Sequence, residues 1–351
     1  MLKAYSKAVR AAVPEMNLTD NAKIKIAYTP LHGSGNITVR RVLKDAGFLN
    51  ITTVAAQEEA DGNFPTVASP NPGSEAAMKM AMELGEEIGA DIAVGSDPDA
   101  DRAGVAIRHH GKLEFLDGNS MAALMLKYLT DRFGRELPEH PLFVTTIVSG
   151  ELASDIAKKR GMEVCKVLTG FKYIGEQMTL CQDDPARNFF FGCEESYGFL
   201  SGDYARDKCA AFAILTLCSA CAWYAQRCRS LGDVMDEIHE EYGFYLDSLD
   251  SYKFPGKEGA EKMKNLTAAL RTEGKDLLPD VDRITDYAPG MEGLPPSDVL
   301  KFFFGDGSWM AIRPSGTEPL IKVYYSTRGE SAEAAEASYL ARKERMDRFF
   351  A

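Results

Sequence analysis

The sequence has no long apolar run and no excess of basic charge. None of its apolar stretches reaches the roughly 20 residues of a membrane span, and residues 1–17 are too polar for a signal peptide. The 351 residues carry a formal net charge of −12, whereas a nucleic-acid-binding protein normally presents a basic face. We therefore expect neither a membrane nor a nucleic acid as a partner. Small phosphorylated ligands stay compatible with this charge, because a few local donors can hold them.

Cysteine and histidine patterns typical of metal sites are also missing. The seven cysteines are odd in number and form no secreted disulfide framework, which favours a reducing cytoplasm. Cys218 and Cys221 have C-x-x-C spacing, but they lie in an apolar helical run and no second zinc-spaced pair accompanies them. We expect them to be small core residues. The five histidines are scattered and predict no ligand cluster.

Length and composition predict a globular protein of two or three domains. It is 45% hydrophobic and 26% charged, as is usual for such proteins. Strand and helix patterns alternate up to residue 116 and again over 117–245, which indicates two consecutive α/β domains. Residues 246–351 instead show successive strands and a closing helix, which indicates a smaller antiparallel α+β domain. We thus predict domains at 1–116, 117–245 and 246–351.

The predicted elements follow from hydrophobic periodicity and from capping and turn residues. The strands are expected at 23–28, 51–55, 91–95, 104–108, 113–116, 142–148, 162–167, 189–192, 242–252, 281–287, 299–304, 309–312 and 320–326. The main helices are expected at 36–46, 75–88, 119–133, 150–160, 209–228, 231–241, 256–271 and 331–350, with Ser74 capping the second of them. Residues 193–208 are expected to be a polar loop.

The most informative stretch is the loop after the apolar strand at 91–95. Asp97, Asp99 and Asp101 stand at alternate positions, and Arg102 follows directly. Three like charges so close together are unfavourable unless something neutralises them, and Mg²⁺ prefers carboxylate oxygens. Ligands of open α/β sheets bind beyond the carboxyl ends of the strands, where this loop lies. The loop therefore predicts a magnesium site; the alternative is a solvated acidic turn.

Two other chemistries can be tested on the same residues. An EF-hand loop beginning at Asp97 would need glycine at its sixth position and glutamate at its twelfth, where Arg102 and Arg108 stand. That possibility is rejected. A phosphatase with an aspartate nucleophile also begins with D-x-D after a strand, but Asp101 occupies a position where Thr or Val is expected. It stays a distant alternative.

Two further polar loops carry binding chemistry. Glu194 and Ser196 follow the strand at 189–192 and can exchange hydrogen bonds with sugar hydroxyls, while Arg206 nearby adds charge or forms a surface pair. The loop at 313–319, Arg-Pro-Ser-Gly-Thr-Glu-Pro, lies between two apolar strands. Its phosphate-binding groups are a guanidinium, two hydroxyls and a glycine that lets backbone N–H groups converge on an anion, from Arg313, Ser315, Thr317 and Gly316.

Together these loops resemble those of the α-D-phosphohexomutase superfamily, the phosphoglucomutases and phosphomannomutases. The resemblance rests on Thr-Pro-Leu-His-Gly at 29–33, the acidic loop at 97–102, Thr-Gly-Phe-Lys at 169–172, Gly-Cys-Glu-Glu-Ser at 192–196 and the loop at 313–319. The acidic loop and Glu-Glu-Ser-Tyr-Gly-Phe at 194–199 are similar to the branch containing bacterial α-phosphoglucomutases and phosphopentomutase-like enzymes.

The resemblance implies an isomerase that moves phosphate between O1 and O6 of a hexose through a bisphosphorylated sugar. Its ligands would be glucose 1-phosphate, glucose 6-phosphate and glucose 1,6-bisphosphate, with one Mg²⁺ beside the reacting phosphoryl group. The implied roles are metal binding by Asp97, Asp99 and Asp101, phosphoryl contact by Arg102, and general acid/base chemistry by Lys172. Sugar and phosphate binding fall to Glu194, Ser196, Arg206, Arg313, Ser315, Gly316 and Thr317.

The family has four domains, and the first carries a phosphorylated serine in a Thr-Ala-Ser-His-Asn-Pro type of loop. We expect this sequence to correspond to domains two to four. Ala-Ser-Pro-Asn-Pro at 68–72 looks like the serine loop, but its position matches an ordinary second-domain loop, so Ser69 is not expected to be the nucleophile. We therefore expect negligible turnover from this chain without the serine domain as a partner. A non-catalytic sugar-phosphate-binding module, and phosphopentomutase or phosphomannomutase specificity, stay open.

Overall fold

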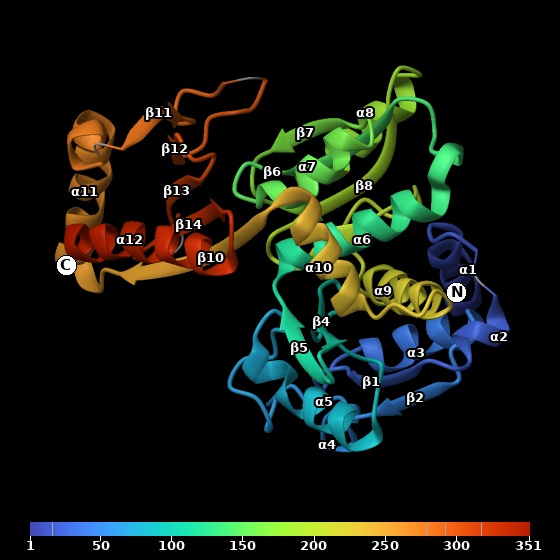
Figure 1. Ribbon diagram of the computed structural model, residues 1–351. Helices are drawn as coiled ribbons and strands as arrows, with labels where there is room; N and C mark the ends of the chain where they lie inside the picture. Colours follow the sequence, from blue (N-terminus) through green and yellow to red (C-terminus); the bar gives the residue numbers. More distant parts are fainter. Residues whose placement is uncertain (16, 279, 292, 317) are drawn as a thin grey trace. The chain divides into compact units, whose positions relative to one another are not determined.

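The computed structural model describes residues 1–15, 17–278, 280–291, 293–316 and 318–351, with only the backbone of Arg135. The chain divides into two compact units, Met1–Ile238 and His239–Ala351, which are described one after the other (Figure 1).

The first unit begins with a five-stranded mixed sheet. Its strands are β1 (Lys25–Thr29), β2 (Asn50–Thr53), β3 (Ile92–Ser96), β4 (Ala103–His109) and β5 (Lys112–Leu116), in the order β2-β1-β3-β4-β5. The pairs of β1 with β2 and β3 are parallel, and β3, β4 and β5 form an antiparallel meander. All residues of β3 are buried, as expected for the apolar central strand of a sheet covered on both faces.

A second sheet in the same unit is mostly parallel. Its strands are β6 (Pro141–Thr146), β7 (Glu163–Val167), β8 (Asn188–Glu194) and β9 (Gly198–Leu200), in the order β7-β6-β8-β9. Only β9 is antiparallel to its neighbour. The connecting helices are α6 (Gly118–Phe133), α7 (Glu151–Lys159) and α8 (Phe171–Asp183), with the short 3₁₀ helix η1 (Gly134–Glu136) after α6.

Helix α9 (Ala210–Ala225) joins the two sheets. It contacts β3 and β4 of the first sheet and β9 of the second, and nearly all of its residues are buried (Figure 1). Both cysteines of the C-x-x-C pair are buried in it, which confirms that they are core residues. The remaining helices of the unit are α1 (Leu2–Ala11), α2 (Leu18–Asn21), α3 (Gly35–Asp45), α4 (Ala55–Glu58), α5 (Glu75–Ile88) and α10 (Leu231–Tyr242), the last of which runs past the end of the unit.

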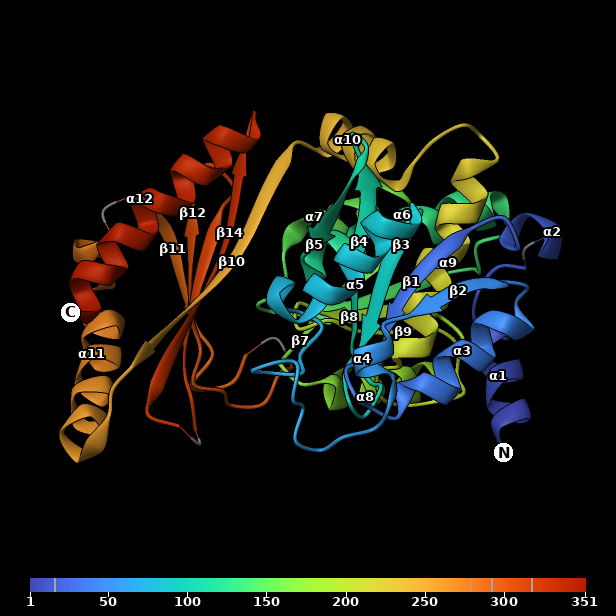
Figure 2. The same ribbon diagram turned by 90° about the horizontal axis from the view of Figure 1, so that it is seen from below.

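The second unit is an antiparallel sheet with helices on one face (Figure 2). The strands β10 (Phe244–Lys253), β11 (Val281–Asp286), β12 (Leu300–Phe304), β13 (Trp309–Pro314) and β14 (Leu320–Gly329) lie in the order β10-β14-β13-β12-β11. Helices α11 (Gly256–Leu277) and α12 (Ala332–Phe350) cover a core that includes Phe302, Ile312 and Met346. The hairpin predicted between β12 and β13 is present, with Gly307 in the left-handed region.

The predicted fold class is confirmed, and the domain limits at 116 and 245 stay predictions. Several local expectations are wrong. The polar loop expected at 193–208 contains β9, which is short and forms by pairing with β8. Ser74 does stand at the N-cap of α5, but its side chain makes no capping hydrogen bond, and the helix expected at 256–271 continues to Leu277. Within the residues that the structure describes, no helix combines the length and apolar character that crossing a bilayer requires.

Candidate metal and sugar-phosphate site

The acidic loop is the turn of the tight β3–β4 hairpin. Ser96 pairs with Ala103, so residues 97–102 connect the two strands. The Oδ1 atom of Asp97 accepts hydrogen bonds from the backbone nitrogens of Asp101 and Arg102, each at 2.9 Å. Ala100 has a left-handed φ of 60°, which lets the chain turn back. The carboxylate of Asp97 thereby fixes the shape of its own loop.

The three aspartates form a group that fits a hard divalent cation. One carboxylate oxygen from each of Asp97, Asp99 and Asp101 lies within 4.8 Å of the others. Asp97 is only 7% exposed; burial raises its pKa to about 7, backbone hydrogen bonding from Arg102 opposes this, and the charges of Asp101 and Asp99 raise it further. Oδ1 of Asp101 is buried and accepts no hydrogen bond from the described residues. These oxygens suit Mg²⁺, which would relieve the repulsion among them.

The turn at residues 33–34 packs against the acidic loop and stabilises it. Both the backbone nitrogen and the hydroxyl of Ser34 donate to the carbonyl of Pro98, at 2.8 and 3.0 Å. A Cβ atom on Gly33 would lie 2.3 Å from Cα of Pro98, so the close approach requires glycine. His32, with a left-handed φ of 61°, fixes the turn through a 2.8 Å hydrogen bond between Nε2 and Oγ1 of Thr66. The glycine in the Thr-Pro-Leu-His-Gly stretch was the available signal for this role, which the sequence analysis did not assign.

The segment from β9 to α9 lies directly against the acidic loop. Arg102 forms a β-bridge with Gly198, and the backbone nitrogen of Ala103 donates to the carbonyl of Tyr197 at 3.2 Å. Nζ of Lys208 is 2.9 Å from Oδ2 of Asp101. Lys208 is therefore part of the site, and its side chain is only 13% exposed.

Glu194 is a buried carboxylate at the end of β8. It is 5% exposed, and its Oε1 accepts a 3.0 Å hydrogen bond from the backbone nitrogen of Gly170. Burial raises its pKa to about 7; the charge of Glu195 adds to this rise, and Lys208 opposes it. At neutral pH Glu194 can thus accept or donate a hydrogen bond. The Gly170 contact also ties the 169–172 turn to the end of β8.

The neighbouring Glu195 has a different environment. Its Oε2 accepts hydrogen bonds from the hydroxyls of Thr146 and Ser149, at 2.9 and 3.1 Å. These contacts hold the end of β8 to the loop after β6, so Glu195 supports the site from the second sheet. The sequence offered a carboxylate here but no indication of its hydroxyl partners.

The other site residues predicted in the first unit differ in their exposure and in their hydrogen bonds. Lys172 is exposed in the first turn of α8, with Nζ 4.9 Å from the centre of the Tyr173 ring. Ser196 is half-buried between β8 and β9. Nη1 of Arg206 donates to the carbonyls of Asp203 and Ala205, both at 3.0 Å, so this guanidinium already holds its own turn.

The loop after β13 belongs to the second unit. The backbone nitrogen of Ser315 donates to the carbonyl of Leu320, and Oγ of Ser315 accepts from the backbone nitrogen of Glu318 at 3.2 Å. Arg313 is half-buried and Gly316 is exposed, with open space around it. Thr317, also predicted for this site, lies outside the described residues. A hollow of about 850 Å³ beside α11 is lined partly by residues 313–316.

The structure also brings an aspartate of α10 to a pair of histidines that are neighbours in the sequence. His109, His110 and Asp236 each offer a ligand atom, and these atoms lie within 4.8 Å of one another. The expectation that the histidines form no cluster is therefore wrong. Sequence spacing could not show it, because the third member comes from a distant helix.

Comparison with known proteins places every part of this arrangement in one family. Residues 3–111 match the family model "phosphoglucomutase/phosphomannomutase, alpha/beta/alpha domain II", residues 117–242 match domain III, and residues 257–343 match the C-terminal domain. A curated phosphoglucomutase of Staphylococcus epidermidis is 35% identical over 336 residues, covering 92% of this chain and 60% of that protein. The chain spans about 60% of the length of the curated relatives it matches.

Solved structures show the same fold. The open form of parafusin, a phosphoglucomutase from Paramecium, has a TM-score of 0.74 at 18% identity and covers 99% of this chain and 62% of that one. An Aspergillus fumigatus N-acetylphosphoglucosamine mutase, in complex with GlcNAc-6P and magnesium, has a TM-score of 0.55 at 13% identity, covering 99% of this chain and 69% of that one. With three consecutive family domains matched along its length, the chain belongs to the phosphoglucomutase/phosphomannomutase family.

Proposed function

We propose that this chain supplies the metal-binding, sugar-binding and phosphate-binding parts of a phosphoglucomutase, which interconverts glucose 1-phosphate and glucose 6-phosphate through glucose 1,6-bisphosphate. The observation that carries the proposal is the junction of the acidic loop with the segment from β8 to α9. Lys208 pairs with Asp101, and Arg102 bridges to Gly198 of β9, which itself pairs with Glu194 at the end of β8. This arrangement offers a phosphoryl site and a sugar site side by side.

At the acidic loop, Asp97, Asp99 and Asp101 would hold one Mg²⁺, which supplies neutralisation of the charge on the reacting phosphoryl group. Nε of Arg102 is buried and has no hydrogen-bond partner in the part of the chain that is described. This nitrogen lies 3.8 Å from Oδ1 of Asp101, and the Arg102 side chain is 39% exposed, so its guanidinium can also meet a phosphoryl oxygen, which guanidinium groups bind well. Magnesium in the Aspergillus relative supports the choice of ion.

Glu194, Ser196 and Lys172 serve the sugar in this proposal. Glu194 is held by Gly170, so its second carboxyl oxygen can bind a ring hydroxyl. Ser196 adds a hydroxyl, and Arg206 closes the turn beside them. The exposed ammonium of Lys172 transfers a proton at the sugar oxygen that gains or loses the phosphoryl group.

The loop after β13 binds the phosphate that does not react. Arg313 and Ser315 line the hollow beside α11, and Gly316 leaves its backbone open to an anion. We include Thr317 in this set on the strength of its sequence.

The sugar and the location of the protein are also part of the proposal. Because the relatives are named phosphoglucomutase, we propose glucose as the sugar rather than mannose or a pentose. The seven free cysteines support the cytoplasm as the location we propose.

Calorimetric titration of the 351-residue chain with glucose 1,6-bisphosphate in excess Mg²⁺ tests the proposal. We expect saturable binding, weakened at least about tenfold by Arg313→Ala, since a bidentate guanidinium contact is lost. Arg345→Ala is the control, because Arg345 pairs with Asp280 on the surface of the same unit. Absence of binding by the parent chain would refute the proposal.

A second step separates a mutase from a binding module. A serine-bearing first domain of the family is added in trans, and interconversion of glucose 1-phosphate and glucose 6-phosphate is followed. Restored turnover supports the mutase. Binding of the bisphosphate without turnover supports a non-catalytic sugar-phosphate-binding module instead.

A further inference from the structure

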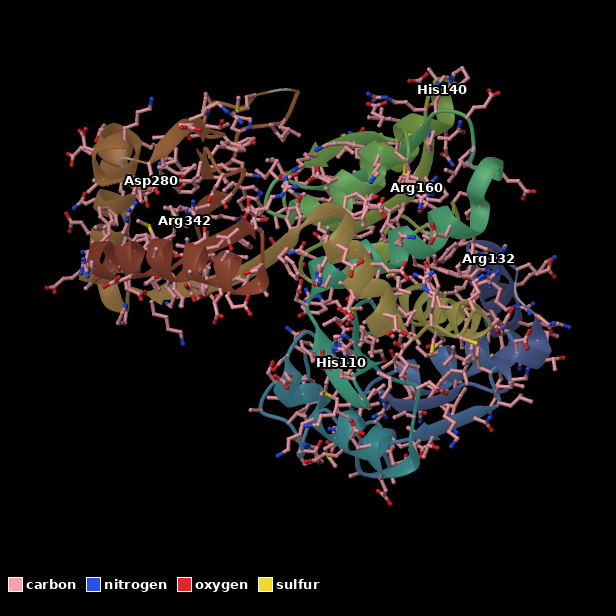
Figure 3. All side chains as sticks on the ribbon, in the orientation of Figure 1. His110, Arg132, His140, Arg160, Asp280 and Arg342 are labelled. Carbon is pink, nitrogen blue, oxygen red and sulfur yellow. The ribbon has the colours of Figure 1, made fainter. Side chains whose placement is uncertain are left out.

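A second group of metal-ligand side chains lies at the tip of the β4–β5 hairpin. His109 is the last residue of β4, and His110 and Gly111 form the turn, with φ values of 45° and 82°. The His109 and His110 rings lie with their centres 3.8 Å apart, and Asp236 of α10 completes the cluster. Figure 3 labels His110 at this hairpin.

His109 is held in one orientation by groups on both sides. Its Nδ1 is 2.8 Å from Oε2 of Glu114, and its Nε2 is 3.1 Å from Oδ2 of Asp236. A Cβ atom on Gly232 would lie 2.4 Å from Cδ2 of His109, so helix α10 packs directly on the ring. A carboxylate on one nitrogen of a histidine is the arrangement that orients the other nitrogen toward a metal. Glu114 takes that place here.

The charges around the cluster favour a cation. The carboxylates of Glu114 and Asp236 lie on opposite nitrogens of the His109 ring, at 2.8 and 3.1 Å. A divalent ion bound at this ring would offset the negative charge of the two carboxylates.

We propose that His109, His110 and Asp236 bind a transition-metal ion of the zinc class, with Glu114 holding His109 in place. Two imidazoles and a carboxylate suit Zn²⁺ and its neighbours, whereas Mg²⁺ prefers oxygen ligands alone. Metal–ligand bonds of about 2.0–2.2 Å need ligand atoms about 3–4 Å apart. The exposed His110 ring can close the remaining gap by rotating about its side-chain bonds. Water supplies the open position.

The site is separate from the acidic loop and does not depend on mutase activity. Its ligands come from the hairpin and from α10, and 127 positions separate His109 from Asp236 in the sequence. A bound ion would therefore cross-link the hairpin to α10 within the first unit. Binding of the ion should therefore stabilise the folded protein against thermal unfolding by mass action.

Cobalt(II) is the probe, because its visible absorption reports imidazole and carboxylate ligands. The full chain, without a polyhistidine tag, is titrated with Co²⁺ in millimolar Mg²⁺, which keeps the acidic loop occupied. We expect one Co²⁺ per chain and at least about tenfold weaker binding in His110→Asn. His140→Asn is the matched control, since His140 is also exposed and also has a left-handed φ, of 50° (Figure 3). Asparagine tolerates that conformation, so both variants should fold.

Equal affinity of the parent and His110→Asn would overturn the proposal, as would a parent chain that binds no Co²⁺. The variant Cys228→Ser tests whether a thiolate binds the Co²⁺ instead, because Cys228 is the exposed cysteine. Loss of the signal in that variant, with the signal kept in His110→Asn, would assign the ion to the thiol and likewise refute the histidine site. Zn²⁺ should displace the Co²⁺ in the parent, and thermal unfolding should show stabilisation that His110→Asn lacks.

Discussion

The ammonium nitrogen of Lys208 lies 2.9 Å from Oδ2 of Asp101, so a lysine from the segment before α9 neutralises part of the acidic loop. Burial lowers the pKa of Lys208, but hydrogen bonding and charge from Asp101 outweigh burial and raise it. The lysine therefore stays charged at neutral pH. It both stabilises the loop in the absence of metal and reduces the negative charge offered to a cation.

Replacing Lys208 by methionine should separate these two effects. We expect Lys208→Met to lower the free energy of unfolding without Mg²⁺ by about 1.5–3 kcal/mol, the usual contribution of a hydrogen bond to a charged group. Mg²⁺ should bind several-fold more tightly, because the triad is then more negative, and should restore much of the lost stability. Calorimetry and thermal unfolding with and without Mg²⁺ measure both quantities. Lys79→Met, on an exposed helix position, is the control, and weaker Mg²⁺ binding in Lys208→Met would contradict the argument.

Removing one ligand should weaken metal binding without harming the fold. Asp99 is exposed, so Asp99→Asn should change the free energy of unfolding by less than about 0.5 kcal/mol. Its loss of charge should weaken Mg²⁺ binding at least about tenfold, since Mg²⁺ relies on carboxylate oxygens. Titration followed by calorimetry measures the affinity. Asp203→Asn, another exposed aspartate in the same unit, should bind Mg²⁺ like the parent; unchanged affinity in Asp99→Asn would remove that residue from the site.

Glu194 should make stability depend on pH. Its pKa rises from 4.5 to about 7 in the fold, so the folded state holds the proton more tightly than the unfolded state does. The stability that the proton on Glu194 contributes is therefore fully present below about pH 4.5, and it is lost as the pH rises through about 7. Glu194→Gln stays neutral and should be about 1–3 kcal/mol more stable than the parent near pH 8, with no difference at low pH. Urea unfolding at both pH values tests this.

Glu83→Gln is the control for that comparison, because Glu83 is exposed on α5 and pairs only loosely with Lys79. It should show the same small difference from the parent at every pH. A stability offset for Glu194→Gln that does not change with pH would show that ionisation of Glu194 is not its cause.

The close approach of Gly33 to Pro98 should not tolerate a methyl group. Gly33→Ala places Cβ at 2.3 Å from backbone carbon of Pro98, so the turn or the acidic loop must shift. We expect a loss of about 1–3 kcal/mol in the free energy of unfolding, with weaker Mg²⁺ binding as well. Gly62→Ala is the matched control, since nothing lies within 4 Å of a Cβ atom there. If both variants bind Mg²⁺ equally well, the turn does not position the metal loop.

The sequence could predict the features whose signals are local. Buried strands such as β3 are apolar runs, and the loops that follow them carry alternating carboxylates or an arginine next to hydroxyls. Such patterns predict both the α/β order and the candidate ligands, since a strand and the loop after it are continuous in the chain. The placement of Asp97, Asp99 and Asp101 at one hairpin turn follows from this continuity.

Features made by distant segments left no such signal. Strand β9 has three residues and forms only because β8 and the bridge to Arg102 flank it. The pairs of Lys208 with Asp101 and of His109 with Asp236 likewise join segments far apart in the sequence. Their partners are chosen by tertiary packing, which no periodicity or spacing records. The same is true of the two hydroxyls that hold Glu195.

The hydrogen bonds at Asp97 have a consequence for the choice of ion. Oδ1 of Asp97 already accepts from two backbone nitrogens, so this carboxylate presents only its other oxygen to a cation. Ca²⁺ is commonly held by at least one carboxylate that binds through both oxygens, whereas Mg²⁺ takes single oxygens in a compact octahedron. The backbone of the hairpin thus selects the smaller ion before any ligand arrives, and an Mg²⁺ complex should resist competition by equimolar Ca²⁺.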